Sequence, residues 1–228
     1  MKCLSHSQAA AILLALALFT SDSANAQLIT SDPSLPPQGV YITPDQVHAS
    51  YSIPGLNVTL NQPRHSDFTS ITRTTVGADE MESFNSVLAG TADVDLGGTL
   101  VPGVAFSASG PVQTIVFGKA GHVTGTFQTE MLSMAVSGIT PLAPFTIRES
   151  PTLASRGTTT IEDIGGGMYR ISSFFDVFTE LTVDGGQTWI PDSSGPTRVV
   201  LVPEPKSIGL IGVGLCAILA YRSWRKRA

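Results

Sequence analysis

Alternation of apolar and polar residues is the feature that most constrains what this chain can fold into. In the stretch Phe175–Asp184, "FDVFTELTVD", the odd positions hold Phe, Val, Thr, Leu and Val, and the even positions are mainly polar. Successive side chains of a β-strand point to opposite faces of the sheet, so one face would pack on a core and the other would meet water. The stretch therefore predicts antiparallel sheet with one wet face.

Glycine and proline interrupt the rest of the chain at short intervals from Val40 onward. Asp184–Gly186 and Gly165–Gly167 predict tight turns, because these residues accept positive φ. Short helical turns are expected only at Pro44–His48 and Asp79–Ser83. The other expected strands are Ser83–Val87, Thr91–Leu96, Val104–Ser107, Val112–Phe117, Thr124–Thr129, Leu132–Val136, Thr146–Arg148, Thr158–Ile164, Met168–Ser172 and Arg198–Leu201.

Many short strands without a long amphipathic helix or an internal repeat favour a two-layered all-β domain. We predict an antiparallel β-sandwich or jelly-roll-like domain over residues 40–201.

The N-terminus has the three parts of a secretory signal peptide. Lys2 gives a positive start, Ala9–Phe19 ("AAAILLALALF") is apolar, and Ala24-Asn25-Ala26 is a small-x-small site before Gln27. We expect signal peptidase to read Ala24, Ala26 and Gln27, which makes 1–26 a signal peptide and 27–39 a Pro-rich leader. A retained membrane helix would need a longer apolar run. A lipoprotein would carry its cysteine after the apolar run, whereas Cys3 precedes it.

The C-terminus combines a Pro-Glu-Pro motif (202–205), an uncharged stretch (207–221) and a basic tail (222–228). The stretch Ser207–Tyr221 would reach about 22 Å as a helix, against a hydrocarbon core of about 30 Å. Flanking basic residues can snorkel, and positive residues stay cytoplasmic. We predict a single transmembrane helix that leaves the folded domain outside the inner membrane. An amphipathic or core helix is the alternative, but 208–220 has no polar face.

This three-part order at the extreme C-terminus resembles the PEP-CTERM sorting signal of Gram-negative bacteria. The resemblance implies recognition by an exosortase, processing near the motif, and delivery to the cell surface or exterior, often together with exopolysaccharide. The residues that carry the match, and that the enzyme would read, are Val202, Pro203, Glu204, Pro205, Arg222, Arg225, Lys226 and Arg227. Asp79–Gly90, and the segment from Arg148 to Pro196, look like the β-rich cargo domain that recurs in PEP-CTERM proteins. No catalytic activity comes with that likeness.

Charge and cysteine content narrow the classes of partner. Between Gln27 and Val202 the chain has seven Lys and Arg against sixteen Asp and Glu, a net charge of −9. Such acidity disfavours nucleic acid and anionic lipid as partners. Both cysteines, Cys3 and Cys216, lie in the terminal segments. The exported part thus has no disulfide, no cysteine nucleophile and no cysteine-based metal site.

The histidines give no catalytic or metal-binding pattern. His48, His65 and His122 are far apart and match no metal-ligand spacing. Arg64–Asp67 ("RHSD") places His, Ser and Asp next to one another, but neighbours on a strand point to opposite faces and cannot form a triad. We predict no metal site and no cofactor.

Two carboxylate pairs and three aromatic residues are weaker candidates for a site. Asp93 and Asp95, and likewise Asp176 and Glu180, would each share a strand face, where a pair could support acid–base hydrolysis or hold calcium. Sugar stacking could use aromatic rings exposed on the sheet, and packing in the core is the alternative for them. These rings are Trp189, Phe178 and Tyr169.

Together these features predict an exported, exosortase-processed surface or matrix protein without catalysis, with a structural or adhesive role beside exopolysaccharide. A carbohydrate-binding module is the alternative, and a secreted hydrolase that uses a carboxylate pair is the less favoured one.

Overall fold

The computed structural model describes residues 27–44 and 47–203, and these residues form thirteen β-strands and no helix. The expected all-β class is confirmed. The strands are β1 (Leu28–Thr30), β2 (Val40–Ile42), β3 (Val47–Ile53), β4 (Leu56–Val76), β5 (Asp79–Asp95), β6 (Leu100–Val116), β7 (Gly125–Ile139), β8 (Pro144–Glu149), β9 (Ser155–Gly165), β10 (Met168–Val177), β11 (Thr179–Thr182), β12 (Ile190–Pro191) and β13 (Thr197–Val202). Within this part of the chain, nothing helical is long and apolar enough to cross a membrane. The expected signal peptide (1–26), sorting helix (207–221) and basic tail (222–228) lie outside the described residues.

The strands are longer than the sequence predicted, because pairs of expected short strands are continuous. β5 joins Ser83–Val87 to the expected strand that begins at Thr91, and it ends at Asp95, one residue before the expected Leu96. It also contains Asp79–Ser83, where the expected helical turn is wrong. From Glu82 to Leu88, buried residues alternate with more exposed ones, which is the period of a strand. The helical turn expected at Pro44–His48 is wrong at its C-terminal end too, since β3 begins at Val47.

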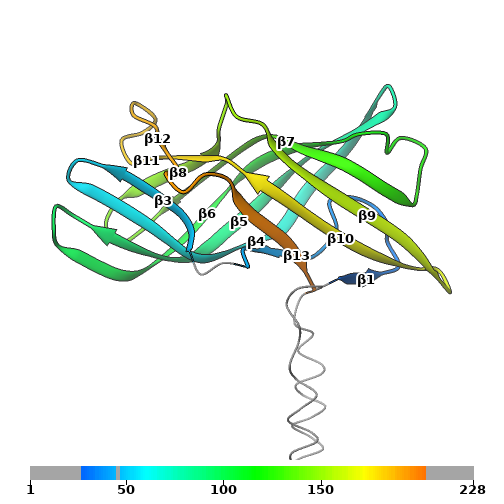
Figure 1. Cartoon of the computed structure of the whole chain (residues 1–228), viewed down its shortest axis with the longest axis horizontal. Coiled ribbons are helices and arrows are strands. Elements are labelled where there is room, and N and C mark those ends of the chain that lie inside the picture. The colour runs from blue at the N-terminus through cyan, green and yellow to red at the C-terminus, as the bar shows by residue number, and fades with distance from the viewer. Residues whose placement is uncertain (1–26, 45–46, 204–228) are drawn as a thin grey trace, which may run out of the picture.

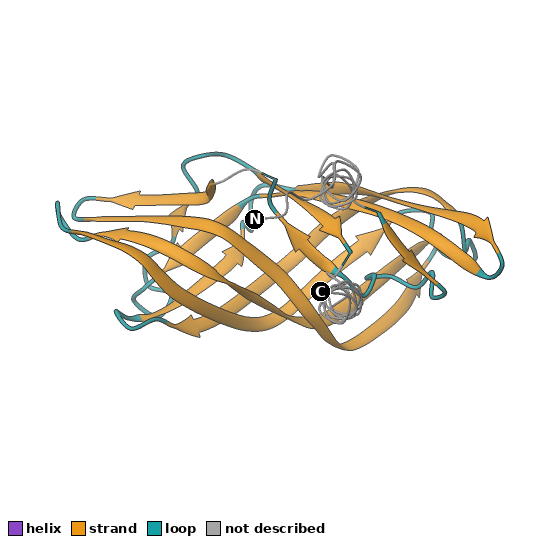
Figure 2. Ribbon diagram, turned by 90° about the horizontal axis from the view of Figure 1, so that it is seen from below, coloured by secondary structure: helices purple, strands orange, loops and turns teal. Residues whose placement is uncertain are grey.

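All the strands belong to one antiparallel sheet, and its pairings close on themselves. The order β10-β13-β2-β4-β5-β6-β7 is a continuous path, and β9 pairs with both ends of it. Figure 1 shows β9 and β10 running side by side, with β4, β5 and β6 beyond them. Strands nearer the viewer cross those behind obliquely in Figure 2. Eight strands thus surround a common interior.

A second group of strands extends the sheet from one end. The later half of β7, Ala135–Ile139, pairs with β8 rather than with β9, and β11 and β12 follow β8 in order. β3 lies on the other side, paired with β4. Tyr51 of β3 reaches across to this group: its hydroxyl bonds to the hydroxyl of Thr179, and its backbone bridges to Asp192.

The expected strand Phe175–Asp184 is two strands. Its alternation is confirmed from Phe175 to Leu181, which is buried like Val177 and Thr179. Beyond Leu181 the prediction is wrong, because Val183 is exposed and Thr182 is buried. At Phe178, however, the chain changes partners: β10 pairs with β9 and β13, whereas β11 pairs with β8 and β12. The Phe178 carbonyl accepts from the Ser150 N–H, and its own N–H donates to the Ser155 hydroxyl.

Strand β4 bends repeatedly along its length of 21 residues. Three of its residues have positive φ, namely Gln62, Asp67 and Ser70, and its register with β5 shifts beside each. Extra residues of this kind are β-bulges, which bend a strand and increase its twist. They let one strand follow the curvature of a closed sheet.

The Pro-rich segment 27–39 packs into the domain. Its first residues form β1, which pairs with β10 at Leu28↔Ile171. Leu35 is 2% exposed and belongs to the hydrophobic core.

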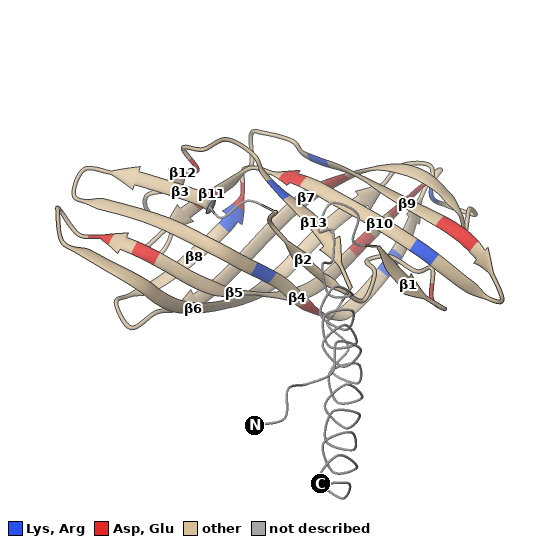
Figure 3. Ribbon diagram, turned by 60° about the horizontal axis from the view of Figure 1, so that its bottom comes forward, with Lys and Arg blue, Asp and Glu red and all other residues tan. Residues whose placement is uncertain are grey.

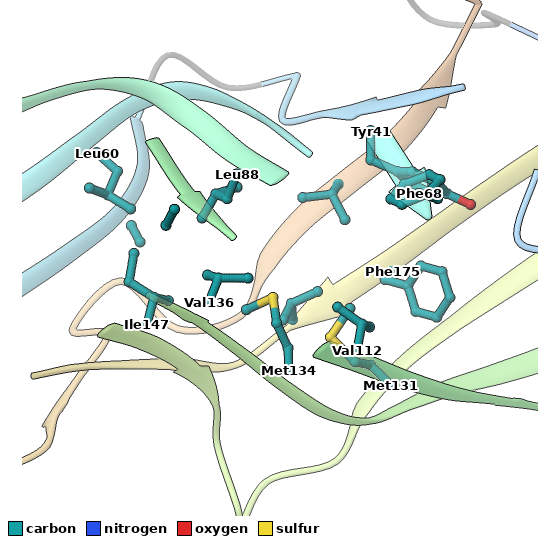
Figure 4. Close-up of a cluster of buried hydrophobic side chains, with 14 of the residues drawn as sticks. Tyr41, Leu60, Phe68, Leu88, Val112, Met131, Met134, Val136, Ile147 and Phe175 are labelled. Atoms are coloured by element: carbon teal, nitrogen blue, oxygen red, sulfur yellow. The ribbon is translucent and has the colours of Figure 1, made fainter. Parts of the chain in front are cut away.

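The core fills the space that the sheet encloses (Figure 4). Around Tyr41 the rings pack edge to face or tilted, with centroids 6.0 Å from Phe68 and 6.1 Å from Phe175. Met131 and Met134 of β7 lie in the same cluster. Because the described residues contain no cysteine, this packing must supply the stability that disulfides give some other domains.

Close approach of backbones makes glycine necessary at several strand positions. A Cβ on Gly110 of β6 would lie 2.0 Å from the Ala135 carbonyl oxygen of β7. We expect Gly110→Ala to lower the free energy of unfolding by about 3 kcal/mol, because a methyl group must force the strands apart. Urea denaturation measures this loss.

The control for Gly110→Ala is Ser109→Ala, an exposed neighbour on the same strand, which should change the free energy of unfolding by less than about 0.5 kcal/mol. Equal stabilities for the two variants would contradict the close approach of β6 and β7.

Candidate functional site

The outer face of β8 and β11 carries a stack of three side chains that comes from strand register. Arg148 of β8 lies directly opposite Glu180 of β11. Its Nε and Nη2 donate to Glu180 Oε2 at 2.9 and 2.7 Å. The guanidinium also lies over the ring of Trp189, 3.7 Å from its centre, in a cation–π contact. Cross-strand charge pairs of this kind stabilise a sheet.

A second stack of the same kind lies on β10 and β13. Asp176 and Arg198 are opposite each other in register. Arg198 donates from Nε and Nη2 to the two carboxylate oxygens at 2.8 and 2.7 Å, and its guanidinium lies 4.4 Å from the ring centre of Phe174. The hydrogen bonds that Asp176 accepts raise the pKa of Arg198.

These ion pairs argue against Asp176 and Glu180 as a catalytic or calcium-binding pair. Both point outward, as expected, but they lie on two strands, β10 and β11, and each already accepts two hydrogen bonds from an arginine. A general acid or a calcium ligand would have to give up that arginine. Figure 3 shows the charged residues dispersed over the strands rather than gathered in one cleft.

Asp93 and Asp95 lie at the end of β5 and shape the hairpin that leads to β6. Asp93 accepts from the Gly103 N–H at 2.8 Å, and this bond lowers the pKa of Asp93 below its usual value. Asp95 accepts from the Gly98 N–H at 2.7 Å. Backbone amides are therefore the partners of both carboxylates.

The three candidate sugar-stacking rings lie in different settings. One face of Trp189 is covered by Arg148. Phe178 is half-buried at the break between β10 and β11. Tyr169 packs against the core. The structure does not bring them together as one exposed row.

The two histidines whose side chains the structure describes lie apart: His122 is exposed, and His65 is inside the domain. His65 is buried, its Nε2 contacts the hydroxyl of buried Ser86, and its ring packs edge-on against Phe68. Ser66 bonds instead to exposed Asp67. His65 thus points away from Ser66 and Asp67, as expected. Ser66 and Asp67 contact each other, because Asp67 has positive φ at a bulge of β4. Among the described residues, no three His, Cys, Asp or Glu side chains gather in a way that could hold a metal ion.

The interior of the closed ring holds a carboxylic acid that sequence reasoning missed. Glu82 is 2% exposed, and its Oε2 accepts from the Thr114 hydroxyl at 2.9 Å. Burial raises the pKa of Glu82 to about 7. The signal was present in the sequence: Glu82 shares the inward alternation of Phe84, Ser86 and Leu88 on β5.

A cavity of about 30 Å³ lies beside this acid, and both Glu82 and Thr129 line it. Glu82 Oε1 and Thr129 Oγ1 are buried polar atoms with no hydrogen-bond partner in the protein. A cavity this size has room for a water molecule or two, which would satisfy polar atoms of this kind. The cavity thus places polar groups inside an apolar core, and Leu35, Pro36 and Pro37 line it together with the strands.

Of the residues expected to be read by processing enzymes, few lie in the described part. Gln27 and Pro203 are exposed, and Val202 ends β13. Ala24 and Ala26 lie outside the described residues, as do Glu204, Pro205, Arg222, Arg225, Lys226 and Arg227.

The raised pKa of Glu82 makes stability depend on pH. The folded protein holds this proton up to about pH 7, whereas the unfolded chain releases it near 4.5, so stability falls as pH rises between these values. Glu82→Gln cannot ionise. We expect it to remove about 3 kcal/mol of the fall that wild type shows, measured by urea denaturation across that range.

Glu149→Gln is the comparison, because the pKa of Glu149 is also raised to about 7, mainly by burial. This variant should lose the part of the fall that comes from Glu149 and keep the part that comes from Glu82. If Glu82→Gln retains the full pH dependence of wild type, the assignment of a buried, protonated Glu82 is wrong.

Comparisons with known proteins identify no family for this chain. No protein-family model, no curated protein and no solved structure matches the chain.

Proposed function

We propose that this chain is an exported, exosortase-processed surface or matrix protein, structural or adhesive and without catalysis. The observation that carries the proposal is that both ends of the folded domain lie together on one side. The ends coincide with the two segments expected to be processed.

The meeting of the two ends is visible around Gly39. A Cβ added there would lie 2.7 Å from Leu201 Cδ1 of β13 and 3.8 Å from Leu28 Cδ2 of β1. Figure 1 shows the start of β1 and the end of β13 close together at the lower edge. A domain held at its C-terminus to the inner membrane would present its N-terminal cleavage point to the same surface.

The tail would be presented by a firmly held strand. β13 is paired with β2 on one side and with β10 on the other, and Leu201 is 1% exposed. Only two residues later, Pro203 is exposed. Proline fixes its own φ and favours an extended residue before it, which suits a peptide that an enzyme must bind.

An association with exopolysaccharide draws support from the outer face of the sheet. Uncharged hydroxyl pairs lie across neighbouring strands there: Thr126 with Thr160 at 3.1 Å, and Ser137 with Thr146 at 2.8 Å. All four side chains hydrogen-bond readily to sugar hydroxyls, because each hydroxyl both donates and accepts. We also propose that the closed sheet is flattened into a β-sandwich, in which β4–β7 face β9, β10 and β13 across the core.

The alternatives have less support. A carbohydrate-binding module would need exposed ring faces, but Arg148 covers Trp189 and Tyr169 packs on the core. We make no proposal of hydrolysis, because Asp176 and Glu180 are ion-paired.

Intact-mass spectrometry of the exported protein, from cells with and without an exosortase, tests the proposal. The measured mass should correspond to a chain that begins at Gln27. It should lack the mass of Ser207–Ala228 only in cells that contain the exosortase. Glu204→Ala should block removal of the tail, because it alters the motif that the enzyme is expected to read.

The matched control is Glu162→Ala, which removes a half-exposed acid from the β9–β10 hairpin and should leave processing intact. A mature wild-type protein that retains Ser207–Ala228 would overturn the sorting proposal and leave a simple membrane anchor.

A further inference from the structure

We propose that the group formed by β8 and β11 together with β4–β6 encloses a binding site for a neutral alkyl chain of about ten carbons. The site is a pocket of about 260 Å³ that is distinct from the polar cavity beside Glu82. The inference does not depend on processing of the tail.

The walls of the pocket are inward side chains of five strands. Val58 and Leu60 come from β4 and Val94 from β5, while Ile147 of β8 and Leu181 of β11 close the opposite side. Phe106 of β6 and Phe145 of β8 meet edge to face, with their centroids 5.8 Å apart at 90°, and they also line it. These rings fix the distance between β6 and β8.

The lining offers a ligand no polar partner. Of the fourteen lining residues, only Thr140 is polar. Its hydroxyl is engaged within its own turn, where it donates to the Ala143 carbonyl and accepts from the Leu142 and Ala143 amides. An occupant must therefore be apolar along its whole buried length, because a buried polar group without a partner is costly.

The size of the pocket sets the size of the occupant. An apolar cavity of about 150 Å³ in another protein holds benzene, with its six carbons. Scaled to this volume, the pocket takes about ten carbons.

The mouth of the pocket exposes apolar side chains at three turns. Leu96 is 49% exposed, Leu142 45% and Val183 38%, although all three line the pocket. Exposed apolar residues that surround an apolar pocket mark a binding site more than scattered ones do.

The charges beside the mouth select a neutral head group. Asp95 precedes Leu96 and Asp184 follows Val183, and no Lys or Arg lies within three residues of Leu96, Leu142 or Val183. A carboxylate head would be repelled there, whereas a hydroxyl would not. The geometry points to an alcohol or a neutral lipid chain rather than to a fatty acid.

Equilibrium dialysis with radiolabelled 1-decanol tests the site. The full chain is kept in solution by an amphipathic polymer, because the alkyl chains of a detergent would compete. We expect saturable binding at one site per chain. Ala143→Phe should weaken it about tenfold or more, since the ring fills the pocket from a loop residue whose backbone bonds stay intact.

Ala78→Phe is the matched control, in the exposed β4–β5 turn, and should bind 1-decanol like wild type. If Ala143→Phe fails to fold, as judged by circular dichroism, Leu142→Asp at the exposed mouth takes its place and should also weaken binding. The site is overturned if wild type shows no saturable binding, or if filling or charging the pocket leaves the affinity unchanged.

Two further measurements test the identity of the occupant. Decanoate at pH 8 should bind more weakly than 1-decanol, and equal or tighter binding would overturn the neutral head group. Sedimentation should show the same mass for wild type and Leu142→Asp. A wild-type dimer that Leu142→Asp dissociates would instead make the mouth an interface between two copies.

Discussion

The backbone pairing of β9 with two strands at once holds this domain together. β9 bonds to β10 along one edge and to the first half of β7 along the other. Without it, the path from β10 to β7 would leave two long open edges in a domain that has no cysteine between Gln27 and Val202. Open edges of this kind invite pairing with other chains. With β9 in place, eight strands enclose one core, and the bulges of β4 help the sheet to curve.

The division of β7 between two partners creates two different interiors. Where β7 pairs with β9, the enclosed space contains Glu82, Thr114 and Thr129 and a small polar cavity. Where β7 pairs with β8, the adjoining strands surround an apolar pocket with an open mouth. The first interior couples stability to pH, and the second can accept a ligand. Both follow from one change of partner along a single strand.

Features of the fold that depend on residues close together in the sequence could be predicted, and features that depend on distant segments could not. Alternation in Phe175–Leu181 and the glycine turn at Gly165–Gly167 are local, so they predicted strand and hairpin correctly. Closure by β9 and the change of partner at Phe178 depend on strand register between distant segments. The pairing of Arg148 with Glu180 also depends on this register. Glu180 was a candidate for acid–base chemistry, and in the structure it forms an ion pair. Glu82 was readable in principle from its inward position, but an acid on an apolar face contradicts the usual rule for burial.

Amide hydrogen exchange along β9 tests the closed sheet most directly. In an antiparallel strand, successive residues direct their N–H groups to opposite neighbours. Residues Gly157 to Ile161 pair with β10 and with β7, so all of their amides should be protected to a similar degree. Rapid exchange at every second residue of this segment would show that β9 has one free edge, and it would contradict the closed sheet on which both interiors depend.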